Sequence, residues 1–416
     1  MQIVVFEDER VSHLYPITVG RPAYTILCGS LRLVDWLQRL DASYVSVVRE
    51  HLVEIQRQDF GFLAALPGDA SNVPTLLLNA RLVPSRTVLE SLEQMMHNAH
   101  PGIVRSGKSL AAALLPPGTL PPPPGLTSSH LDAYLVGLGL EDLPPLDMEL
   151  PLLEHPHDVV RFNQETMIEN LSYRLQSGRY QEVADGVFAA EHARLSSYVV
   201  TDTHSGPIVL DEYADIGPYA YLSGPVYIGP HTRVIEHAAI KDSVSIGHTA
   251  KIGGEVEASV IESYTNKQHH GFMGHSYLGS WINLGAGTCN SDLKNTYGEV
   301  KMEYRGRRVS TGMQFIGCII GDYSKSAINT GIFTGKTVGV CSMLYGFVTT
   351  NVPSFVNYAR LFGQVTELPP DVMVATQRRM FTRRNVTQRP CDQQLIQDMY
   401  ELTRDERQLA GEPLSL

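Results

Sequence analysis

Aliphatic residues recur at every sixth position in the middle of the chain. A small or β-branched residue stands four places after each of them, from Ala214 to Val256. This pattern is typical of hexapeptide repeats, in which six residues form one short strand and one corner, and three repeats close one coil of a parallel β-helix. The aliphatic residues expected inside the coil are Leu210, Ile216, Leu222, Ile228, Val234, Ile240, Ile246 and Ile252.

The sixfold pattern is interrupted after these coils and then resumes. Phe272, Leu278 and Leu284 continue it with a shift of two positions. After a loop, further aliphatic residues return at Ile320, Ile332, Val338 and Leu344. An antiparallel sandwich would show a period of two instead of six. We therefore predict a parallel β-helix over residues 186–355.

The chain before the repeats has a different pattern, in which short aliphatic strands alternate with amphipathic helices. This alternation predicts an α/β domain with a parallel sheet over residues 1–185. Strands are expected at 3–6, 44–48 and 75–78, and helices at 31–40, 88–97 and 159–174. Residues 116–156 hold 10 of the 25 prolines and are expected to form a surface excursion. Residues 356–416 are polar, and we expect a tail of two helices divided near Pro390.

Composition and charge narrow the class of protein. With 43% hydrophobic residues, the 416-residue chain can build real cores. Its net charge of -11 argues against non-specific nucleic-acid binding, although a local basic pocket for a phosphorylated ligand remains compatible with it. No stretch has the length of a membrane span, and the apolar run at the start is too short for a signal peptide. The five cysteines are scattered, so we expect reduced thiols, a cytoplasmic location, and neither a membrane nor a nucleic-acid partner.

One apparent phosphate-binding motif is better explained as a turn. Residues 102–109 match the spacing GxxxxGK[ST]. That loop requires a buried strand directly before it and a helix directly after it. Here a helix precedes the segment and prolines follow soon after it, so we predict a hairpin turn.

Polar residues that could carry chemistry gather where the repeats are interrupted, in residues 266–274 and 281–295. A histidine can accept a proton near neutral pH, asparagine amides can orient the hydroxyls of a sugar, and a lysine can meet a phosphate. The run Gly285–Gly287 leaves room for a ligand chain along the coil. The same residues are also typical of corners on a polar surface, so the residues alone leave both interpretations open.

These segments resemble a known family. Residues 264–295 are similar to the acetyltransferase half of the bacterial bifunctional N-acetylglucosamine-1-phosphate uridylyltransferase/glucosamine-1-phosphate acetyltransferases, and residues 1–355 look like a divergent group of sugar nucleotidyltransferases with the same plan. The motifs that carry the resemblance are Asn266–Gly274, Asn283–Thr288, Cys289–Asp292 and Val352–Phe355, with weaker ones at Leu14–Thr18, Arg21–Pro22 and Leu78–Pro84. The resemblance implies a nucleotidyltransferase-like (Rossmann-like) α/β domain, then a left-handed β-helix. It also implies a homotrimer that uses acetyl-CoA as co-substrate.

The resemblance assigns roles to individual residues. His269 matches the catalytic base that takes a proton from the amine of the sugar. The expected substrate contacts are Asn283, Asn290, Asp292, Lys294 and Lys267. The expected acetyl-CoA contacts are Ala286, Gly287 and Ser326, and weak nucleotide contacts are expected at Arg21 and Asn79.

The chain also departs from the family pattern. Phe272 and Glu257 stand where the family has a tyrosine and a lysine that hold the sugar phosphate, and Lys267 would compensate. Residues 8–13 replace the glycine-rich loop, and residues 79–81 lack the aspartate that binds magnesium. Binding of UTP or another nucleoside triphosphate, and a need for Mg²⁺, are therefore expected only if the α/β domain is active.

We expect an N-acetyltransferase that acts on a hexosamine 1-phosphate, and two alternatives remain open. A β-helical zinc hydratase could use His270 and His275, although His237 does not fit the coil spacing of a third ligand. A non-catalytic assembly protein could instead retain sugar-nucleotide binding in its α/β domain.

Overall fold

Two compact units make up the part of the chain that the computed structural model describes, residues 1–64 and 73–409. The first unit contains Met1–Leu14, Gly20–Ile26 and Leu31–Glu154. The second contains Tyr15–Val19, Leu27–Ser30 and the chain from His155 onward. This division differs from the boundary predicted near residue 185, because two short N-terminal segments and the helix after residue 155 pack with the β-helix.

The first unit is built around a five-stranded sheet with the order β2-β1-β3-β5-β4. Strand β1 is parallel to β2 and β3, as the alternation of strands and helices predicts, whereas β5 is antiparallel to β3 and β4. The β4–β5 hairpin contains the GxxxxGK[ST] segment, which confirms the predicted turn. The strands are β1 (Gln2–Phe6), β2 (Ser43–Val47), β3 (Thr75–Asn79), β4 (Gly102–Ser106) and β5 (Ser109–Leu115).

Four α-helices accompany this sheet. Helix α3 begins after Ser85, whose side chain accepts a hydrogen bond from the backbone N–H of Val88 at 3.2 Å and so caps the first turn. The helices are α1 (Leu33–Leu37), α2 (Val53–Asp59), α3 (Arg86–Asn98) and α4 (Leu131–Gly137).

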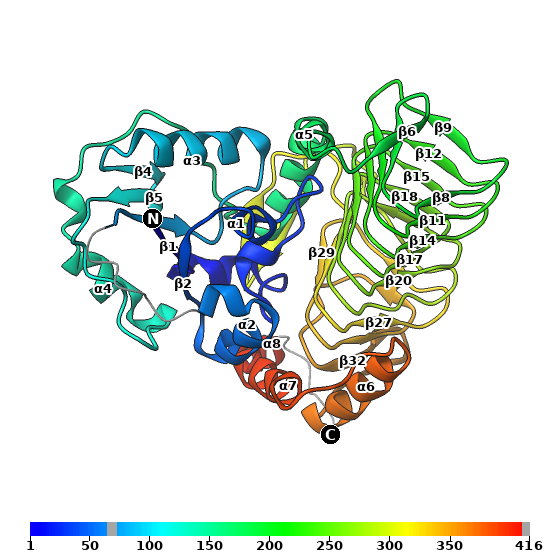
Figure 1. Ribbon diagram of the computed structural model, residues 1–416. Helices are drawn as coiled ribbons and strands as arrows, with labels where there is room; N and C mark the ends of the chain where they lie inside the picture. The colour runs from blue at the N-terminus through cyan, green and yellow to red at the C-terminus, as the bar shows by residue number, and fades with distance from the viewer. Residues whose placement is uncertain (65–72, 410–416) are drawn as a thin grey trace. The chain divides into compact units, whose positions relative to one another are not determined.

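The second unit is a left-handed parallel β-helix, seen in Figure 1 as stacked coils from β6 to β32. Its strands form three faces. The first face is a nine-stranded sheet made of β6 (Gln181–Ala184), β7 (Val187–Ala189), β10 (Ile208–Leu210), β13 (Val226–Ile228), β16 (Val244–Ile246), β19 (Val260–Ile261), β22 (Tyr277–Leu278), β26 (Cys318–Ile320) and β29 (Lys336–Val338).

The second face continues past the predicted end of the repeats. Strands β32 and β33 extend it, with Tyr358 of β32 paired to Leu344. Residues 356–367 therefore form strands and not the beginning of a helical tail. The face contains β8 (Arg194–Leu195), β11 (Asp215–Ile216), β14 (Arg233–Val234), β17 (Lys251–Ile252), β20 (Asn266–Lys267), β27 (Lys325–Ser326), β30 (Met343–Leu344), β32 (Val356–Ala359) and β33 (Gln364–Glu367).

The third face is parallel throughout. Two hydrogen bonds between the backbone of Gly274 and the side chain of Asn290 join β21 to β23. The face is therefore continuous across two sheets. Its strands are β9 (Val200–Asp202), β12 (Tyr221–Ser223), β15 (Ala239–Lys241), β18 (Glu255–Glu257), β21 (Phe272–Gly274), β23 (Cys289–Asn290), β28 (Gly331–Ile332) and β31 (Phe347–Val348).

The predicted repeat residues form the core of this β-helix. All eight aliphatic residues from Leu210 to Ile252 are 0% exposed, and the residues four places after each are at most 1% exposed. Burial of each aliphatic side chain contributes roughly 1.5–3 kcal/mol. The prediction for Phe272 is wrong: its neighbour Met273 pairs with Val256 and points into the core, and Phe272 is on the outside. Leu278 and Leu284 are buried as predicted.

Helix α5 (Pro156–Leu175) lies against the first face of the β-helix. The Asn163 side chain accepts a hydrogen bond from Ser245 Oγ at 2.7 Å and donates one to the Ser243 carbonyl at 2.6 Å. Arg174 forms a buried ion pair with Asp211 at 3.3 Å. These contacts explain why α5 belongs to the second unit.

Up to residue 409, where the described residues end, three helices follow the β-helix, where two were predicted. They are α6 (Pro370–Thr382), α7 (Pro390–Leu402) and α8 (Arg404–Leu409). Helix α7 begins at Pro390, as expected from the sequence. Phe381 at the end of α6 packs against Trp281, with ring centroids 4.5 Å apart. The last part of the predicted tail, residues 410–416, lies outside the described residues.

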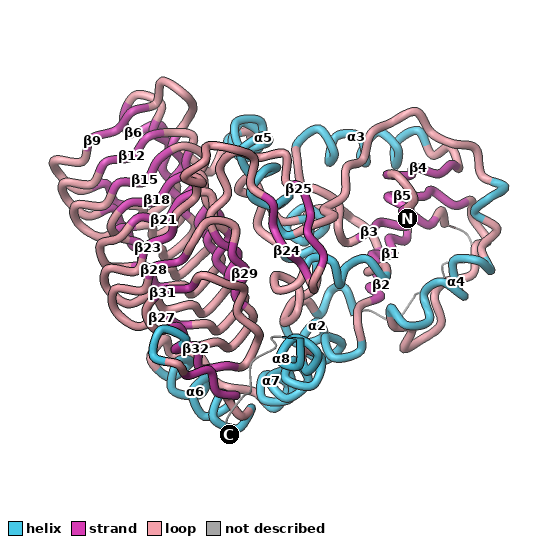
Figure 2. The backbone as a smooth tube through the Cα atoms, turned by 180° about the vertical axis from the view of Figure 1, so that it is seen from behind, coloured by secondary structure: helices cyan, strands magenta, loops and turns pink. Residues whose placement is uncertain are grey.

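An antiparallel hairpin interrupts the coils between β23 and β26. It is made of β24 (Lys301–Tyr304) and β25 (Arg307–Ser310), and Figure 2 shows it projecting beside β29. Met302 and Tyr304 point inward and are buried, whereas Lys301 and Glu303 on the alternate face are exposed. Among the described residues, no helix is both long enough and apolar enough to cross a membrane.

Candidate acyl-transfer site

The corner between the second and third faces changes character along the β-helix. In the early coils its left-handed residue is aromatic: Tyr198, Tyr219 and His237 stack with ring centroids 5.3 and 5.2 Å apart. In the two coils that follow residue 260 the left-handed residue of this corner is a glycine, Gly271 and then Gly287. A Cβ on Gly271 would lie 2.1 Å from the backbone carbonyl oxygen of Thr288, so this position requires glycine. A ridge of rings therefore gives way to a surface without side chains at these positions.

His269 and Ala286 lie on this corner in consecutive coils. His269 is exposed, with its Nε2 atom 3.1 Å from the side-chain nitrogen of Gln268. The backbone N–H of Gly287 donates to the His270 carbonyl at 3.1 Å, which stacks the two turns directly. Within residues 1–64 and 73–409, no atom accepts a hydrogen bond from the backbone N–H of Ala286. The corner thus offers a proton acceptor and a free amide donor on adjacent turns.

Asn283 precedes this corner on the outer side of the second face and is exposed, as a substrate contact must be. Its side-chain oxygen accepts a hydrogen bond from Asn266 Nδ2 at 3.5 Å. The structure therefore brings together His269, Asn283, Ala286 and Gly287 from the predicted set.

Lys267 does not join them on the surface. Its side chain occupies the core column of the second face between Ile252 and Leu284, and it is only 2% exposed. All three N–H groups of the ammonium donate to backbone carbonyls: those of Gly253 at 2.8 Å, His269 at 3.0 Å and Gly271 at 2.5 Å. Burial lowers the pKa of Lys267 to about 8. Its geometry fits support of the turn that carries His269, not the predicted contact with a phosphate.

Asn290 and Ser326 are also buried supports. Asn290 occupies the core column of the third face, where it accepts from the backbone N–H of Gly274 at 2.9 Å and donates to the Gly274 carbonyl at 3.0 Å. Ser326 Oγ accepts from the backbone N–H of Gly285 at 3.0 Å and lies 2.7 Å from Thr288 Oγ1. Both side chains fix the turns of the corner from inside the coil.

Asp292 and Lys294 contact other residues of their own region. Asp292 Oδ2 lies 2.8 Å from Nδ1 of His275, at the opposite edge of the third face from His269. Lys294 donates to the carbonyl of Glu299 within the same loop. The structure does not bring either side chain to His269, and the His275–Asp292 pair was not expected from the sequence.

The residue at the predicted lysine position carries the opposite charge, and it is paired. Lys241 bridges Glu255 at 2.8 Å and Glu257 at 3.2 Å on the outer side of the third face. Hydrogen bonding to Glu255 and attraction to both carboxylates raise the pKa of Lys241. The lysine of this face is therefore already held by two carboxylates.

Sequence reasoning missed a basic group on the second face. Arg384, just after α6, donates to Asn266 Oδ1 because the Phe381–Trp281 contact anchors the end of that helix. Burial and repulsion from Arg384, Arg233 and Arg383 lower the pKa of Lys251. Lys251, Arg383 and Arg384 form no salt bridge within the described residues. From the sequence, the tail arginines Arg378, Arg379, Arg383 and Arg384 could reach a phosphate or a partner chain, and a solvated helix face is the favoured interpretation. Their position beside Asn266 was not predicted, because Arg384 and Asn266 are far apart in the sequence.

The nucleotide position of the α/β unit is filled by protein groups. Arg81 is 0% exposed, and its five N–H groups donate to Asp8, Ser109, Leu153 and Glu154, with the closest Asp8 oxygen at 2.7 Å. The Asn79 side chain donates to Asp8 at 2.9 Å and to the Leu110 carbonyl at 2.9 Å. A divalent cation needs free carboxylate oxygens, and here a guanidinium neutralises them. These residues do not fit Mg²⁺.

Two predictions remain: Arg21 as a nucleotide contact, and His270 with His275 as zinc ligands. Arg21 is half-buried, and its backbone carbonyl accepts a hydrogen bond from Arg49 at 2.9 Å. No group of three or more His, Cys, Asp or Glu side chains among the described residues is arranged to hold a metal ion. His270 and His275 are therefore not part of such a group in the described chain.

Comparison with known proteins relates the chain to sugar-phosphate enzymes. Residues 3–179 match the family model described as sugar nucleotidyl transferase. The bifunctional sugar-1-phosphate nucleotidylyltransferase/acetyltransferase of Sulfurisphaera tokodaii is 30% identical over 158 residues, 35% of this chain and 37% of that protein. The bifunctional protein GlmU of Methanocaldococcus jannaschii is 30% identical over 117 residues, 28% of this chain and 26% of that protein. The matches thus span from about a quarter to just over a third of these relatives.

Solved structures give weaker likenesses. The UDP-N-acetylglucosamine acyltransferases of Francisella novicida and Campylobacter jejuni are 17% and 13% identical, each with a TM-score of 0.22. The alignments cover 55% and 53% of this chain, and 82% and 86% of those chains. The fold assignment accordingly rests on the strand register of the chain itself.

The predicted resemblance is confirmed by the family match and the relatives together. Residues 3–179 match the sugar nucleotidyl transferase family model, and part of the chain is similar to bifunctional sugar-1-phosphate nucleotidylyltransferase/acetyltransferases.

Proposed function

We propose that the β-helix unit transfers an acetyl group from acetyl-CoA to the amine of a hexosamine 1-phosphate. The observation that carries this proposal is the pairing of an exposed His269 with the free backbone N–H of Ala286 on directly stacked turns. A general base and an amide donor for a developing oxyanion are the two groups that acyl transfer needs.

The chemistry follows from these two groups. His269 accepts a proton from the amine as the amine nitrogen attacks the thioester carbon, and the new N–C bond forms. The Ala286 N–H stabilises the negative charge on the carbonyl oxygen. The C–S bond then breaks, the thiolate of CoA leaves, and it takes up a proton. The products are an N-acetylhexosamine 1-phosphate and CoA.

The basic group on the second face is proposed to meet a phosphate of a substrate. Lys251, Arg383 and Arg384 lie beside Asn266 and Asn283, and they supply the positive charge that Glu257 and Phe272 do not. This assignment replaces the predicted role of Lys267.

We expect acetyl transfer to glucosamine 1-phosphate or an isomeric hexosamine 1-phosphate, measured as release of the free thiol of CoA. Turnover with the hexosamine phosphate and none with N-acetylated sugar would support an amine acceptor. Absence of thiol release with every hexosamine phosphate would contradict the proposal.

We expect the Arg384→Gln variant to raise the KM for the hexosamine 1-phosphate by roughly tenfold, because a charge-assisted contact to phosphate is lost. The kcat should change little, since Arg384 does not touch the reacting atoms. Arg379→Gln is the matched control. Arg379 is exposed on α6, and its side chain donates a hydrogen bond to the Ala375 carbonyl of the same helix. Equal KM values for the two variants would remove Arg384 from the binding site.

The assembly and the α/β unit complete the proposal. We propose a cytoplasmic homotrimer in which neighbouring β-helices share the corner that carries His269. The α/β unit is proposed to have a structural role and to bind no metal ion. The Arg81–Asp8 ion pair occupies the position where the resemblance places a nucleotide. No step of the proposed reaction uses Mg²⁺ or UTP.

A further inference from the structure

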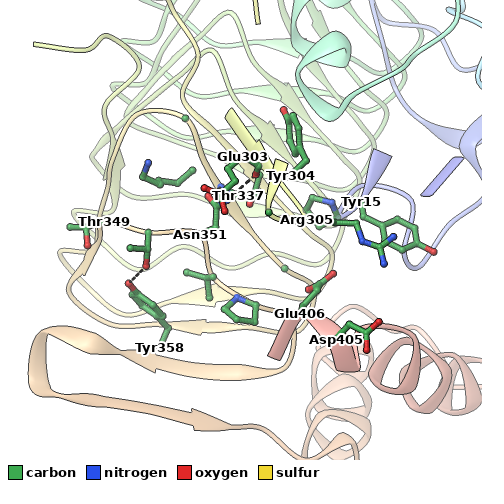
Figure 3. Close-up of a pocket in the computed structure, with 18 of the residues that line it drawn as sticks. Tyr15, Glu303, Tyr304, Arg305, Thr337, Thr349, Asn351, Tyr358, Asp405 and Glu406 are labelled. Atoms are coloured by element: carbon green, nitrogen blue, oxygen red, sulfur yellow. Dashed lines mark hydrogen bonds between the residues drawn. The ribbon is translucent and has the colours of Figure 1, made fainter. Parts of the chain in front are cut away.

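A pocket lies away from the His269 corner, in the same unit. It has a volume of about 540 Å³ and is lined by the β24–β25 hairpin, strand β29 and helix α8, among other segments (Figure 3). Strand β29 belongs to the first face, whereas His269 lies on the corner between the second and third faces. None of the residues of the proposed acyl-transfer site lines this pocket. Its volume is within the range of roughly 300–1,000 Å³ that small-molecule sites have.

Cations dominate the lining of this pocket. Five basic side chains line it against three acidic ones. Four of the basic groups have no salt bridge and no side-chain hydrogen bond in the described part of the chain, namely Lys301, Arg305, Arg308 and Lys336. The fifth, Arg360, donates to Thr350 Oγ1 at 2.9 Å.

In the described part of the chain, the acidic groups of the pocket form no ion pair with these four cations. Glu406 accepts hydrogen bonds from the Ser354 hydroxyl at 2.7 Å and the Ser354 backbone N–H at 3.0 Å. Burial raises the pKa of Glu406. Glu303 lies opposite Arg308 in the hairpin register without forming an ion pair with it. Burial lowers the pKa of Lys336; attraction to Glu303 opposes this shift, and repulsion from Arg308 adds to it.

The walls of the pocket are held together by Asn351. Its side chain donates to the Glu303 carbonyl of β24 at 2.9 Å, and its oxygen accepts from the backbone N–H of Thr337 in β29 at 3.0 Å. Figure 3 shows both residues beside Asn351, with Arg305 extending toward Tyr15. The Arg305 guanidinium lies 5.8 Å from the centre of the Tyr15 ring. The hairpin is thus fixed to the coil, and the cations are presented by a preformed frame.

We propose that this pocket binds a small phosphorylated molecule, whose phosphate groups are held by Arg305, Arg308 and Lys336. Guanidinium groups bind phosphate oxygens in a bidentate manner, and here two of them are available without first breaking an ion pair. The volume of the pocket suits a small molecule better than a nucleic acid, which agrees with the net charge of -11. The inference does not depend on the acyl transfer proposed above.

Isothermal titration of the full-length protein with UDP, pyrophosphate and uridine tests this inference. We expect UDP and pyrophosphate to bind and uridine not to bind, because phosphate provides the recognition. The double variant Arg305→Ala/Arg308→Ala should weaken both ligands by roughly tenfold or more, which is the loss expected from removing charged hydrogen bonds. Added salt should also weaken binding.

Matched variants separate this pocket from the rest of the molecule. Arg307 lies on the same hairpin and does not line the pocket. The affinity of the Arg307→Ala variant for UDP and pyrophosphate should therefore equal that of the wild type. Lys336→Gln gives a second variant inside the pocket, and it should also weaken the binding of UDP and pyrophosphate. Binding of uridine as tight as that of UDP, or an equal loss in Arg307→Ala, would overturn the inference. Absence of binding of both phosphate compounds at millimolar concentration would do so as well.

Discussion

The His269→Ala variant is expected to lose acetyl transfer by a factor of about 10²–10⁴, the usual contribution of a general base. His269 is the exposed imidazole on the turn that stacks on Ala286, and it has no buried role in the fold. The variant should therefore keep the oligomeric state and thermal stability of the wild type. Release of CoA thiol under saturating substrates is the measurement.

His270→Ala provides the matched control for this experiment. His270 is the adjacent residue and is exposed, as His269 is. Its hydrogen bond to the next turn uses its backbone carbonyl and not its side chain. We expect its activity to stay within about twofold of the wild type, because a surface side chain away from the reacting atoms contributes little. Loss of activity in His270→Ala, with retention in His269→Ala, would reverse the assignment of the base.

The Lys267→Met variant is expected to lower kcat by roughly tenfold or more. Methionine fits an aliphatic core column, but the carbonyls of Gly253, His269 and Gly271 lose their donor, and each unsatisfied buried carbonyl costs about 1–3 kcal/mol. The turn that holds His269 then loosens. The KM for acetyl-CoA should change little, which distinguishes a positioning residue from a ligand contact.

The same variant tests the titration of Lys267. Because its pKa is lowered to about 8, the unfolded chain binds more protons than the folded chain between about pH 8 and the ordinary pKa of 10.5. As the pH rises through this window, the free energy of unfolding of the wild type should increase by about 3 kcal/mol relative to that of Lys267→Met. Below about pH 8 the difference between the two proteins should not depend on pH. Denaturant unfolding at several pH values measures this change.

Lys325→Met is the matched control for Lys267. Burial lowers the pKa of Lys325 to about 8 as well, but its ammonium donates to the Tyr323 carbonyl, away from the His269 turn. This variant should lose a similar part of the pH-dependent stability and keep its kcat. If both variants lose activity equally, general destabilisation and not positioning explains the effect of Lys267.

The β-helix could be predicted because its core is periodic. The aliphatic columns from Leu210 to Ile252 follow directly from the sixfold spacing, and every one of them is buried. The prediction failed at Phe272 because corners after Ile252 change length, so Met273 and not Phe272 follows Val256 in the column. A period extrapolated across such a change selects the neighbouring residue, which points to the other side of the strand.

The candidate site was predictable only in part, for a related reason. His269, Asn283 and Ala286 lie in turns or on outward positions, and their motif identifies them. Lys267 and Asn290 belong to the same motif, yet the altered register turns them into the core, where polar groups must find backbone partners. The contact of Arg384 with Asn266 depends on the packing of Phe381, and no local pattern encodes it.

The path of the chain between its two units limits how the protein can be divided or recombined. Leu27, Gly29 and Ser30 donate backbone hydrogen bonds to Glu262, Asn163 and Ser245, although they come from the N-terminal part of the chain. The chain crosses between the units at residues 14–15, 19–20, 26–27, 30–31 and 154–155. A single breakpoint near residue 185 would thus separate the β-helix from segments that belong to it. Gene fusion or exchange of the α/β part can preserve the β-helix only if the incoming part carries equivalent segments at the same places.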